Sequence, residues 1–301
     1  MPDMQISQTI QKINYLHDRV SFNDVEYEKW NDNIALTIAS YIYSTNQYLT
    51  TQEEVQMSQL INFAHRGSSA ICPENTMAAF AKGLEQGATG IETDVQMTKD
   101  GRLVLIHDES VARTTGAEGL VKDYTYDELA KLDAGSWFGA DFQGERIPLL
   151  EELLELTKNH GTIVNIELKN GSIQYPELEK RVIETVRHYN MSEQIVISSF
   201  NHYSLVECKH IDPEIRTGLL YGEGLYKPWE YAKLAKADAL HAYHRAVLPE
   251  WVEEAKQHGV VYHPWTVNDE EQMKTLIDAG VAGIITDYPD VLGGLLQIKG
   301  A

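Results

Sequence analysis

The feature that most constrains the fold of this 301-residue chain is an alternation of short β-branched segments with helical patterns, which begins at Leu60. Such alternation is typical of consecutive βα units. Four of the helical patterns end at a glycine, the residue preferred just after a last helical turn. Eight strands, each followed by a helix, predict an α/β fold of the (β/α)₈ TIM-barrel type. The predicted strands are residues 60–65, 90–95, 162–168, 194–199, 216–220, 237–241, 260–265 and 283–286.

A ninth apolar run, residues 102–107, follows the second predicted strand after only a short turn. Parallel neighbours need a crossover of about a dozen residues or more, so these two runs must form an antiparallel hairpin. Reflection about a turn at 98–101 places His107 opposite Glu92 and brings it to the mouth of the barrel. Residues 108–147 then form a small insertion over the mouth, with one helix that begins at a capping box, Thr125 with Glu128.

The first 58 residues have a different sequence pattern, with no glycine and with apolar side chains at helical spacing. They predict an N-terminal arm of two amphipathic helices, followed by the barrel domain at residues 59–301. A closed barrel covers its own sheet, so the arm must bury its apolar faces elsewhere. The charge-free stretch 33–52, which contains several Tyr and Ile residues, predicts a homodimer in which the arm contributes to the interface.

The charge balance limits the partners of the chain. There are 45 acidic and 25 basic residues, a formal net charge of −20, and no run of Lys or Arg. Such a surface repels nucleic acid and anionic lipid headgroups, so neither is predicted as a partner. No signal peptide is predicted, and the longest apolar stretch of the arm, residues 34–43, is too short to span a bilayer. A cytoplasmic protein without a transmembrane segment is predicted.

Three carboxylates lie where predicted strands end. Glu92 and Asp94 are two residues apart on one strand, so both point to the same face, and Glu167 ends the next barrel strand. If that face is the interior, these carboxylates need a cation to remain charged together. Oxygen ligands without Cys or a histidine pattern are typical of a site for one Mg²⁺ or Ca²⁺ ion. The alternative for Glu92 and Asp94 alone is a solvated strand edge.

Two histidines converge on the same mouth, His65 at the end of the first strand and His107 at the end of the hairpin. The ordinary pKa of histidine lies near neutral pH, so this pair is suited to general acid and general base roles. The remaining histidines near helix or strand ends have structural explanations, either the helix dipole or the barrel core. These are His160, His188, His258, His241 and His263.

Other strand-end residues complete the predicted mouth. Arg66 and Lys169 are its only basic residues, and either could bind non-reacting phosphate oxygens. For Lys169, a salt bridge with one of the carboxylates is an equal alternative. Trp265 either fills the core or lines the ligand site. Asn75 is a candidate N-cap for the helix that follows Glu74.

At these residues the sequence resembles the glycerophosphodiester phosphodiesterase family. The similarity is specific because ten short segments occur in the family order over about 240 residues. The segments are AHRG at 64–67, PENT at 73–76, GIETDVQMTKDGRLVLIHD at 90–108, ARTTG at 112–116, LDAGSWF at 132–138, RIPLLEELL at 146–154, NIELK at 165–169, SSF at 198–200, WTVN at 265–268 and ITDYPD at 285–290.

The resemblance implies a catalytic TIM barrel that hydrolyses a small glycerophosphodiester to glycerol 3-phosphate and an alcohol. It implies His65 and His107 as the acid–base pair and Arg66 and Lys169 as phosphate contacts, with Glu74 as a further residue that lines the substrate site. It also implies Glu92, Asp94 and Glu167 as the ligands of a divalent cation. Two alternatives are a lysophospholipase D or phospholipase C-like enzyme acting on lipids, and a barrel that binds a glycerophosphate group without turnover.

Overall fold

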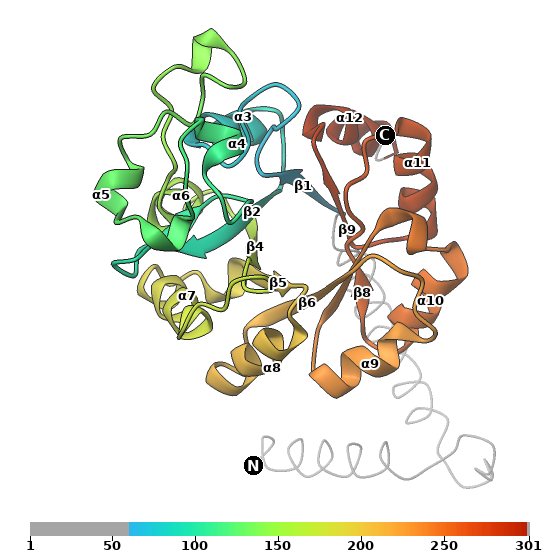
Figure 1. The fold of residues 1–301 in the computed structure, drawn as a ribbon. Helices are drawn as coiled ribbons and strands as arrows, with labels where there is room; N and C mark the ends of the chain where they lie inside the picture. The colour runs from blue at the N-terminus through green and yellow to red at the C-terminus, as the bar shows by residue number, and fades with distance from the viewer. Residues whose placement is uncertain (1–59, 300–301) are drawn as a thin grey trace, which may run out of the picture. The chain divides into compact units, whose positions relative to one another are not determined.

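The computed structural model of the chain describes residues 60–299. The predicted helical arm, and the dimer interface predicted for it, lie outside the described residues. Figure 1 looks into a ring of strands surrounded by helices. The strands are β1 Ile61–His65, β2 Gly90–Met97, β3 Leu103–Leu105, β4 Ile163–Leu168, β5 Ile195–Ser199, β6 Arg216–Tyr221, β7 Ala239–Ala242, β8 Val261–Tyr262 and β9 Gly283–Thr286.

Eight of these strands are parallel and follow the order β8-β7-β6-β5-β4-β2-β1-β9, and β3 pairs with β2 alone. Three backbone hydrogen bonds join the two ends of this sheet. The N–H of Ala282 donates to the carbonyl of Tyr262 (3.1 Å), that of Ile285 to Pro264 (3.0 Å), and that of Val267 to Ile285 (2.9 Å). The ring is therefore nearly closed, and the predicted TIM barrel is confirmed.

Helices lie around the barrel between consecutive strands (Figure 1). The inner faces of the helices that alternate with the barrel strands pack on the outer side of the sheet in one continuous hydrophobic core, which contains Ile91, Val164, Ile197 and Leu240. The helices are α3 Met77–Glu85, α4 Ala112–Thr115, α5 Tyr126–Leu129, α6 Leu150–Thr157, α7 Leu178–His188, α8 His202–Ile211, α9 Pro228–Ala235, α10 Pro249–Gln257, α11 Glu270–Ala279 and α12 Pro289–Lys299.

The predicted hairpin is present, but its register differs by one residue from the prediction. Val95 pairs with Leu105, so continuing the ladder places His107 opposite Thr93 and not opposite Glu92. The reason is the turn, which has three residues and not four. Thr98 and Arg102 close it through a backbone hydrogen bond, and Gly101 has a left-handed φ of +79°. Such a glycine after a short turn is a common hairpin solution.

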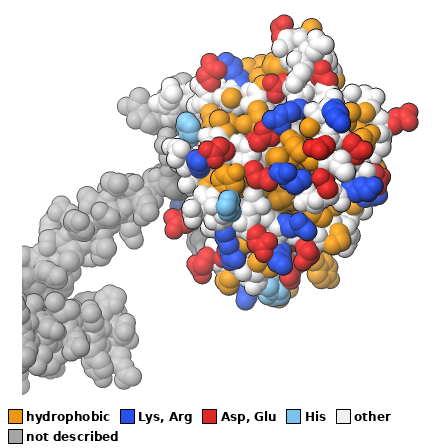
Figure 2. All heavy atoms as spheres, turned by 90° about the vertical axis from the view of Figure 1, so that its left-hand side faces the viewer, with side chains coloured by type: hydrophobic (Ala, Val, Ile, Leu, Met, Phe, Trp, Pro, Cys, Tyr) orange, Lys and Arg blue, Asp and Glu red, His pale blue; other side chains and the backbone are white. Residues whose placement is uncertain are grey.

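The insertion after the hairpin has a small hydrophobic core of its own, formed on β3 by Val104, Ile106, Val121, Leu129 and Ile147. Its helix α5 begins with the predicted capping box, in which the N–H of Thr125 donates to Oε2 of Glu128 (2.8 Å). On the side of the molecule where α5 lies, acidic and basic side chains are mixed with hydrophobic ones (Figure 2).

Candidate active site

The register of the sheet brings the predicted residues together at the carboxyl ends of β1, β2 and β4. His65 is the direct neighbour of Glu92, and Asp94 is the direct neighbour of Glu167. Seven of the nine predicted site residues line one pocket at this end, together with Asn165, Ser198, Phe200, Leu220, Thr266 and Ile285. The seven are His65, Arg66, Glu92, His107, Glu167, Lys169 and Trp265.

The three predicted ligand carboxylates form a buried cluster. Glu92, Asp94 and Glu167 are 4%, 1% and 9% exposed, and one oxygen from each lies within 4.8 Å of the others. Burial raises the pKa of Glu92 well above its ordinary value, and the neighbouring Asp94 and Glu167 add to this shift. Burial and the charge of Asp94 likewise raise the pKa of Glu167 to about 7. The crowding of negative charge in the cluster therefore favours a cation beside it.

The geometry of this cluster fits a divalent metal ion. Two ligand oxygens at about 2.4 Å from one cation are at most about 4.8 Å apart, and the three oxygens here lie within 4.8 Å of one another. Oδ1 of Asp94 is buried and accepts no hydrogen bond, so a ligand atom is available for coordination. A set of carboxylate oxygens suits a hard cation. Among the described residues, these three form the one group found that could hold a metal ion.

The two basic residues of the pocket are bound to these carboxylates. Nε of Arg66 lies 3.3 Å from Oδ2 of Asp94, and the backbone N–H of Arg66 donates to Glu92 (3.0 Å). Nζ of Lys169 lies 2.8 Å from Glu167 and 3.6 Å from Asp94. Burial opposes the charge of Asp94, but Arg66 and Lys169 outweigh it and lower the pKa of Asp94. The salt bridge considered for Lys169 is therefore present.

The backbone at Arg66 explains why a glycine follows it. Arg66 and Gly67 both have a left-handed φ, +55° and +84°. A Cβ atom on Gly67 would lie 2.5 Å from the backbone carbon of Ala79 in α3. Only glycine therefore fits at position 67 of this turn.

His65 is held by a carboxylate that sequence reasoning did not single out. Its Nδ1 lies 2.6 Å from Oδ1 of Asp287, at the end of β9, and its Nε2 lies 4.0 Å from Oε2 of Glu92. Ser69 and Asn268 donate to Asp287 at 2.9 and 2.6 Å. Burial raises the pKa of Asp287, but the hydrogen bond and charge of His65, together with the hydrogen bonds from Asn268 and Ser69, outweigh burial and lower the pKa to about 2. Asp287 is therefore ionised at neutral pH.

His107 has an equivalent partner in the next residue. Its Nδ1 lies 2.6 Å from Oδ1 of Asp108, and Nε of Arg113 donates to Oδ2 of Asp108 (2.6 Å). The bond from Arg113 lowers the pKa of Asp108 to about 2. Burial lowers the pKa of His107, and Arg66 and Lys169 act in the same direction against the charge of Asp94. Each histidine thus has Nδ1 on a carboxylate while the ring itself lines the pocket.

Glu74 does not line the pocket. Its carboxylate accepts hydrogen bonds from Arg66 (2.8 Å) and from Arg113 (two of 2.8 Å). It therefore joins the guanidinium group of the pocket to the insertion, and its contact with the site is indirect.

Asn75 is a second residue whose role the sequence did not show. The N-cap of α3 is Thr76, whose Oγ1 accepts from the N–H of Ala79 (3.2 Å). The Asn75 amide instead donates to Oδ2 of Asp94 (2.9 Å) and accepts from Thr93 (2.7 Å). The signal available was its place between the first strand and α3, where the loops of a barrel carry site residues.

His241 and His263 lie in the barrel interior and do not line the pocket. They are 0% and 4% exposed, and Nδ1 of His263 is 3.0 Å from Nε2 of His241. A Cβ atom on Gly218 would lie 2.3 Å from His241, so the pair fills the core tightly. Trp265 is partly buried and lines the pocket, and its Nε1 donates to the carbonyl of His241 (2.7 Å).

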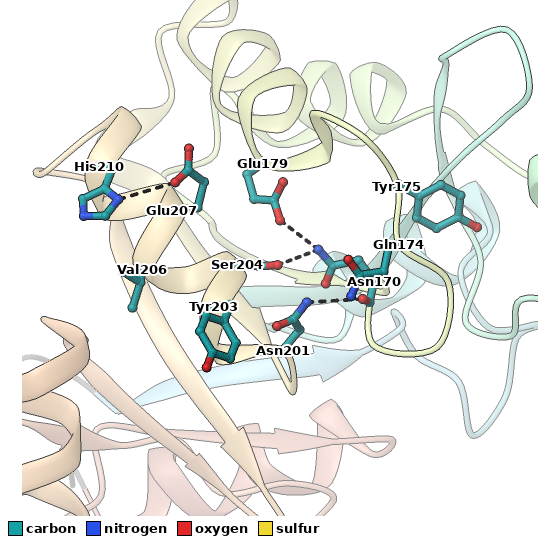
Figure 3. A pocket seen from close by; sticks show the side chains of 10 residues that line it. All are labelled: Asn170, Gln174, Tyr175, Glu179, Asn201, Tyr203, Ser204, Val206, Glu207 and His210. Atoms are coloured by element: carbon teal, nitrogen blue, oxygen red, sulfur yellow. Dashed lines mark hydrogen bonds and ion pairs between the residues drawn. The ribbon is translucent and has the colours of Figure 1, made fainter.

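A separate surface recess lies beside the loop that follows β4, and Figure 3 shows the side chains around it. None of the predicted site residues lines it. Asn170 lines this recess, and its side-chain amide donates hydrogen bonds to Glu179 (2.8 Å) and Ser204 (2.6 Å). These bonds fix the residue after Lys169 to α7 and α8, and so help to position the lysine.

Comparison with known proteins identifies the family. Residues 65–291 match the model of the glycerophosphoryl diester phosphodiesterase family. A glycerophosphodiester phosphodiesterase from Caldanaerobacter subterraneus is 51% identical over 237 residues, 79% of this chain and 98% of the relative. One from Bacillus subtilis is 33% identical over 281 residues, 86% of this chain and 94% of the relative.

Solved structures agree with these sequence matches. A phosphodiesterase from Oleispira antarctica, in complex with the product sn-glycerol-3-phosphate, has a TM-score of 0.72 and 31% identity, covering 78% of this chain and 96% of its own. A glycerophosphodiester phosphodiesterase from Agrobacterium tumefaciens has a TM-score of 0.69 and 30% identity, with coverages of 77% and 98%. This chain therefore belongs to the glycerophosphoryl diester phosphodiesterase family, as its motifs predicted.

Proposed function

We propose that this chain hydrolyses glycerophosphodiesters to glycerol 3-phosphate and an alcohol by two-histidine acid–base catalysis. The observation that carries the proposal is the pairing of His65 and His107 in one pocket with a three-carboxylate cluster. The names of the relatives support the reaction class, and the product bound in the Oleispira antarctica structure supports the products.

The cation of this site is Mg²⁺ or Ca²⁺, held by Glu92, Asp94 and Glu167. These ions prefer oxygen ligands, and the cluster contains only carboxylates. When bound, the ion offsets the negative charge that develops on the phosphoryl oxygens during cleavage. It would also keep the three carboxylates ionised at neutral pH.

The other residues of the site bind the phosphate and transfer protons. Arg66 and Lys169 line the pocket and bind the non-reacting phosphate oxygens, with the planar guanidinium suited to two of them. One histidine accepts the proton of the attacking hydroxyl at Nε2, and the other donates a proton to the leaving alkoxide. Both water and the glycerol 2-hydroxyl suit the role of nucleophile in this arrangement. The carboxylates on Nδ1 hold each ring with Nε2 free for these transfers.

A product-release assay tests the proposal. Glycerol 3-phosphate is measured with glycerophosphocholine, glycerophosphoethanolamine and glycerophosphoglycerol, with and without chelator. His65→Ala and His107→Ala should each lose about 10²- to 10⁴-fold in turnover. His160→Ala is the matched control, because His160 is an exposed residue just beyond α6, and it should keep near-normal turnover. Equal damage in the control would contradict the assignment.

The same assay separates the alternatives. Faster cleavage of micellar lysolipid than of any water-soluble diester would favour a lipid phosphodiesterase, and retention of a diester without cleavage would favour a binding module. Across residues 60–299, none of the helices has both the length and the apolar character required to cross a bilayer.

A further inference from the structure

The segment that carries His107 lies beyond the end of the β2–β3 ladder. The last paired residue of β3 is Leu105, and one further backbone bond follows it, from the N–H of Ile106 to the carbonyl of Asp94 (3.0 Å). In the part of the chain that the structure describes, no backbone N–H group donates to the carbonyl oxygens of residues 106–108. The position of His107 therefore depends on side-chain contacts.

The carbonyl groups of this segment converge on one side-chain amide, that of Gln96 in β2. Its Nε2 donates to the carbonyl oxygens of residues 106, 107 and 108, at 3.2, 3.1 and 2.6 Å. The side chain of Gln96 is fully buried, so water does not compete for these bonds. The amide of Gln96 therefore takes the place of a strand partner for the residues around His107.

Gln96 belongs to the same row of side chains as two of the cluster carboxylates. Residues two apart on a strand share a face, so Glu92, Asp94 and Gln96 follow one another along one face of β2. The residues between and beyond them, Val95 and Met97, lie in the hydrophobic core on the outer side of the sheet. One row of polar side chains thus fixes the carboxylate cluster and the end of the hairpin relative to each other.

A buried tyrosine fixes the orientation of this amide. Backbone carbonyls only accept, so the NH₂ group of Gln96 must face them, and its Oε1 then accepts from the hydroxyl of Tyr175 (2.7 Å). Tyr175 is 6% exposed and lies in the loop between β4 and α7. Figure 3 shows its hydroxyl pointing away from Asn170 and the recess. The same loop begins with Lys169, so this bond joins the segment of His107 to the loop of a predicted phosphate contact.

We infer that Gln96 and Tyr175 are positioning residues that hold His107 in its acid–base position through the backbone of residues 106–108. This inference rests on the proposed function and adds two residues to the same reaction. Neither side chain lines the pocket, so both act through His107 and not on the substrate. Loss of their hydrogen bonds should displace the ring of His107 and leave the phosphate contacts in place, so kcat should fall while KM stays unchanged.

Two variants remove these hydrogen bonds by different routes. Tyr175→Phe keeps the ring and removes the hydroxyl, and Gln96→Met keeps the length of the side chain and removes the amide. A misplacement of about 1 Å costs about 10²-fold in turnover, so kcat should fall about 3- to 10-fold in Tyr175→Phe and about 10- to 100-fold in Gln96→Met. Thr157→Val is the matched control, because the Thr157 hydroxyl is also fully buried and donates to a backbone carbonyl, that of Leu153 in α6 (2.8 Å). It should melt at a lower temperature and keep its kcat.

A double-mutant cycle separates the positioning of His107 from a general effect on the fold. Release of glycerol 3-phosphate from glycerophosphocholine is measured per folded molecule, with Mg²⁺ or Ca²⁺ present. If Tyr175 acts through His107, Tyr175→Phe should lower kcat in the wild-type background and cost almost nothing more in the His107→Ala background. A residue that only stabilises the fold would show the same loss in both.

The outcomes are distinct from those that test the proposed function. A folded Tyr175→Phe variant with wild-type kcat, or one with an equal loss in the two backgrounds, would overturn the inference and leave the phosphodiesterase proposal intact. If His107→Ala alone keeps wild-type turnover, the two-histidine proposal is wrong and the inference falls with it. If Gln96→Met does not fold, Tyr175→Phe decides between these results alone.

Discussion

Replacing Asp287 with Asn tests whether His65 depends on its carboxylate. In the structure Asp287 accepts from three groups, His65 Nδ1 (2.6 Å), Ser69 Oγ (2.9 Å) and Asn268 Nδ2 (2.6 Å). An Asn side chain has one oxygen and one NH₂ group, so one of these donors must face another donor. If the NH₂ group faces His65, the ring must accept at Nδ1, and the proton then occupies Nε2. A neutral ring in that tautomer cannot take a proton at Nε2.

The expected loss of turnover in Asp287→Asn follows from the role of Nε2 of His65 as a proton acceptor. Removing one acid–base contribution costs about 10²- to 10⁴-fold in kcat. KM should change little, because Asp287 does not line the pocket. The pKa of Asp287 is about 2 in the fold. Against about 3.9 in an unfolded chain, this depressed pKa contributes about 2 kcal/mol of stability. That stability is present above pH 4 and is lost as the pH falls through 2.

The assay is steady-state release of glycerol 3-phosphate from pH 5 to 9, with thermal melting of each variant beside it. Asp287→Asn should melt about 5 °C lower and remain folded at 25 °C. One limb of the pH–rate profile should flatten. Asn268→Ala keeps the carboxylate and removes one of its donors, so it should lose less turnover than Asp287→Asn. A folded Asp287→Asn variant with kcat within threefold of the wild type would refute the reasoning.

Three further predictions follow from the cluster, the core and the arm. Chelation should abolish turnover and Mg²⁺ or Ca²⁺ should restore it, whereas Glu92→Ala or Asp94→Ala should need more ion; full activity in excess chelator would contradict the metal site. Burial holds the pKa of His263 at about 3 and that of His241 well below its ordinary value. The unfolded chain therefore binds more protons below about pH 6.5, and stability should fall with pH by up to about 1.4 kcal/mol per unit for each histidine. Between pH 7.5 and pH 5, the urea midpoint should fall less in His263→Gln than in the wild type. An equal fall in both would contradict the buried histidines as the cause of the pH dependence. A chain that begins near Ser58 should run as a monomer in size-exclusion chromatography and keep its turnover, whereas a retained dimer would show that residues 1–58 are not the interface.

The barrel and the carboxylate cluster could be predicted from the sequence because both follow from strand periodicity. Residues two apart on a strand share a face, and parallel strands end at one mouth. Glu92, Asp94 and Glu167 therefore had to meet if their strands were neighbours, and the register confirms that β2 and β4 are. The strand predicted at 260–265 is shorter in the structure, β8 Val261–Tyr262, because Pro264 has no N–H for the ladder.

The groups that hold the histidines could not be found in this way. Asp287 is 222 residues from His65 in the chain, and its contact depends on how the last strand closes the ring. Asn75 and Thr76 are both good helix caps, and only the position of Asp94 decides that Asn75 turns toward the cluster. The one-residue error at His107 came from the turn, whose length the pattern of apolar residues does not specify. A cytoplasmic location and a homodimer stay predictions from the sequence.

The insertion contributes to the candidate active site through Arg113, which contacts the carboxylates that hold two residues of the pocket. Arg113, in α4, donates two hydrogen bonds to Asp108 and two to Glu74. Asp108 holds His107, and Glu74 holds Arg66, so one guanidinium group ties an acid–base residue to a phosphate-binding residue. Both carboxylates are directed by the fixed fork of the same side chain, which a lysine could not reproduce. The relative position of His107 and Arg66 therefore depends on the small core that folds the insertion against β3.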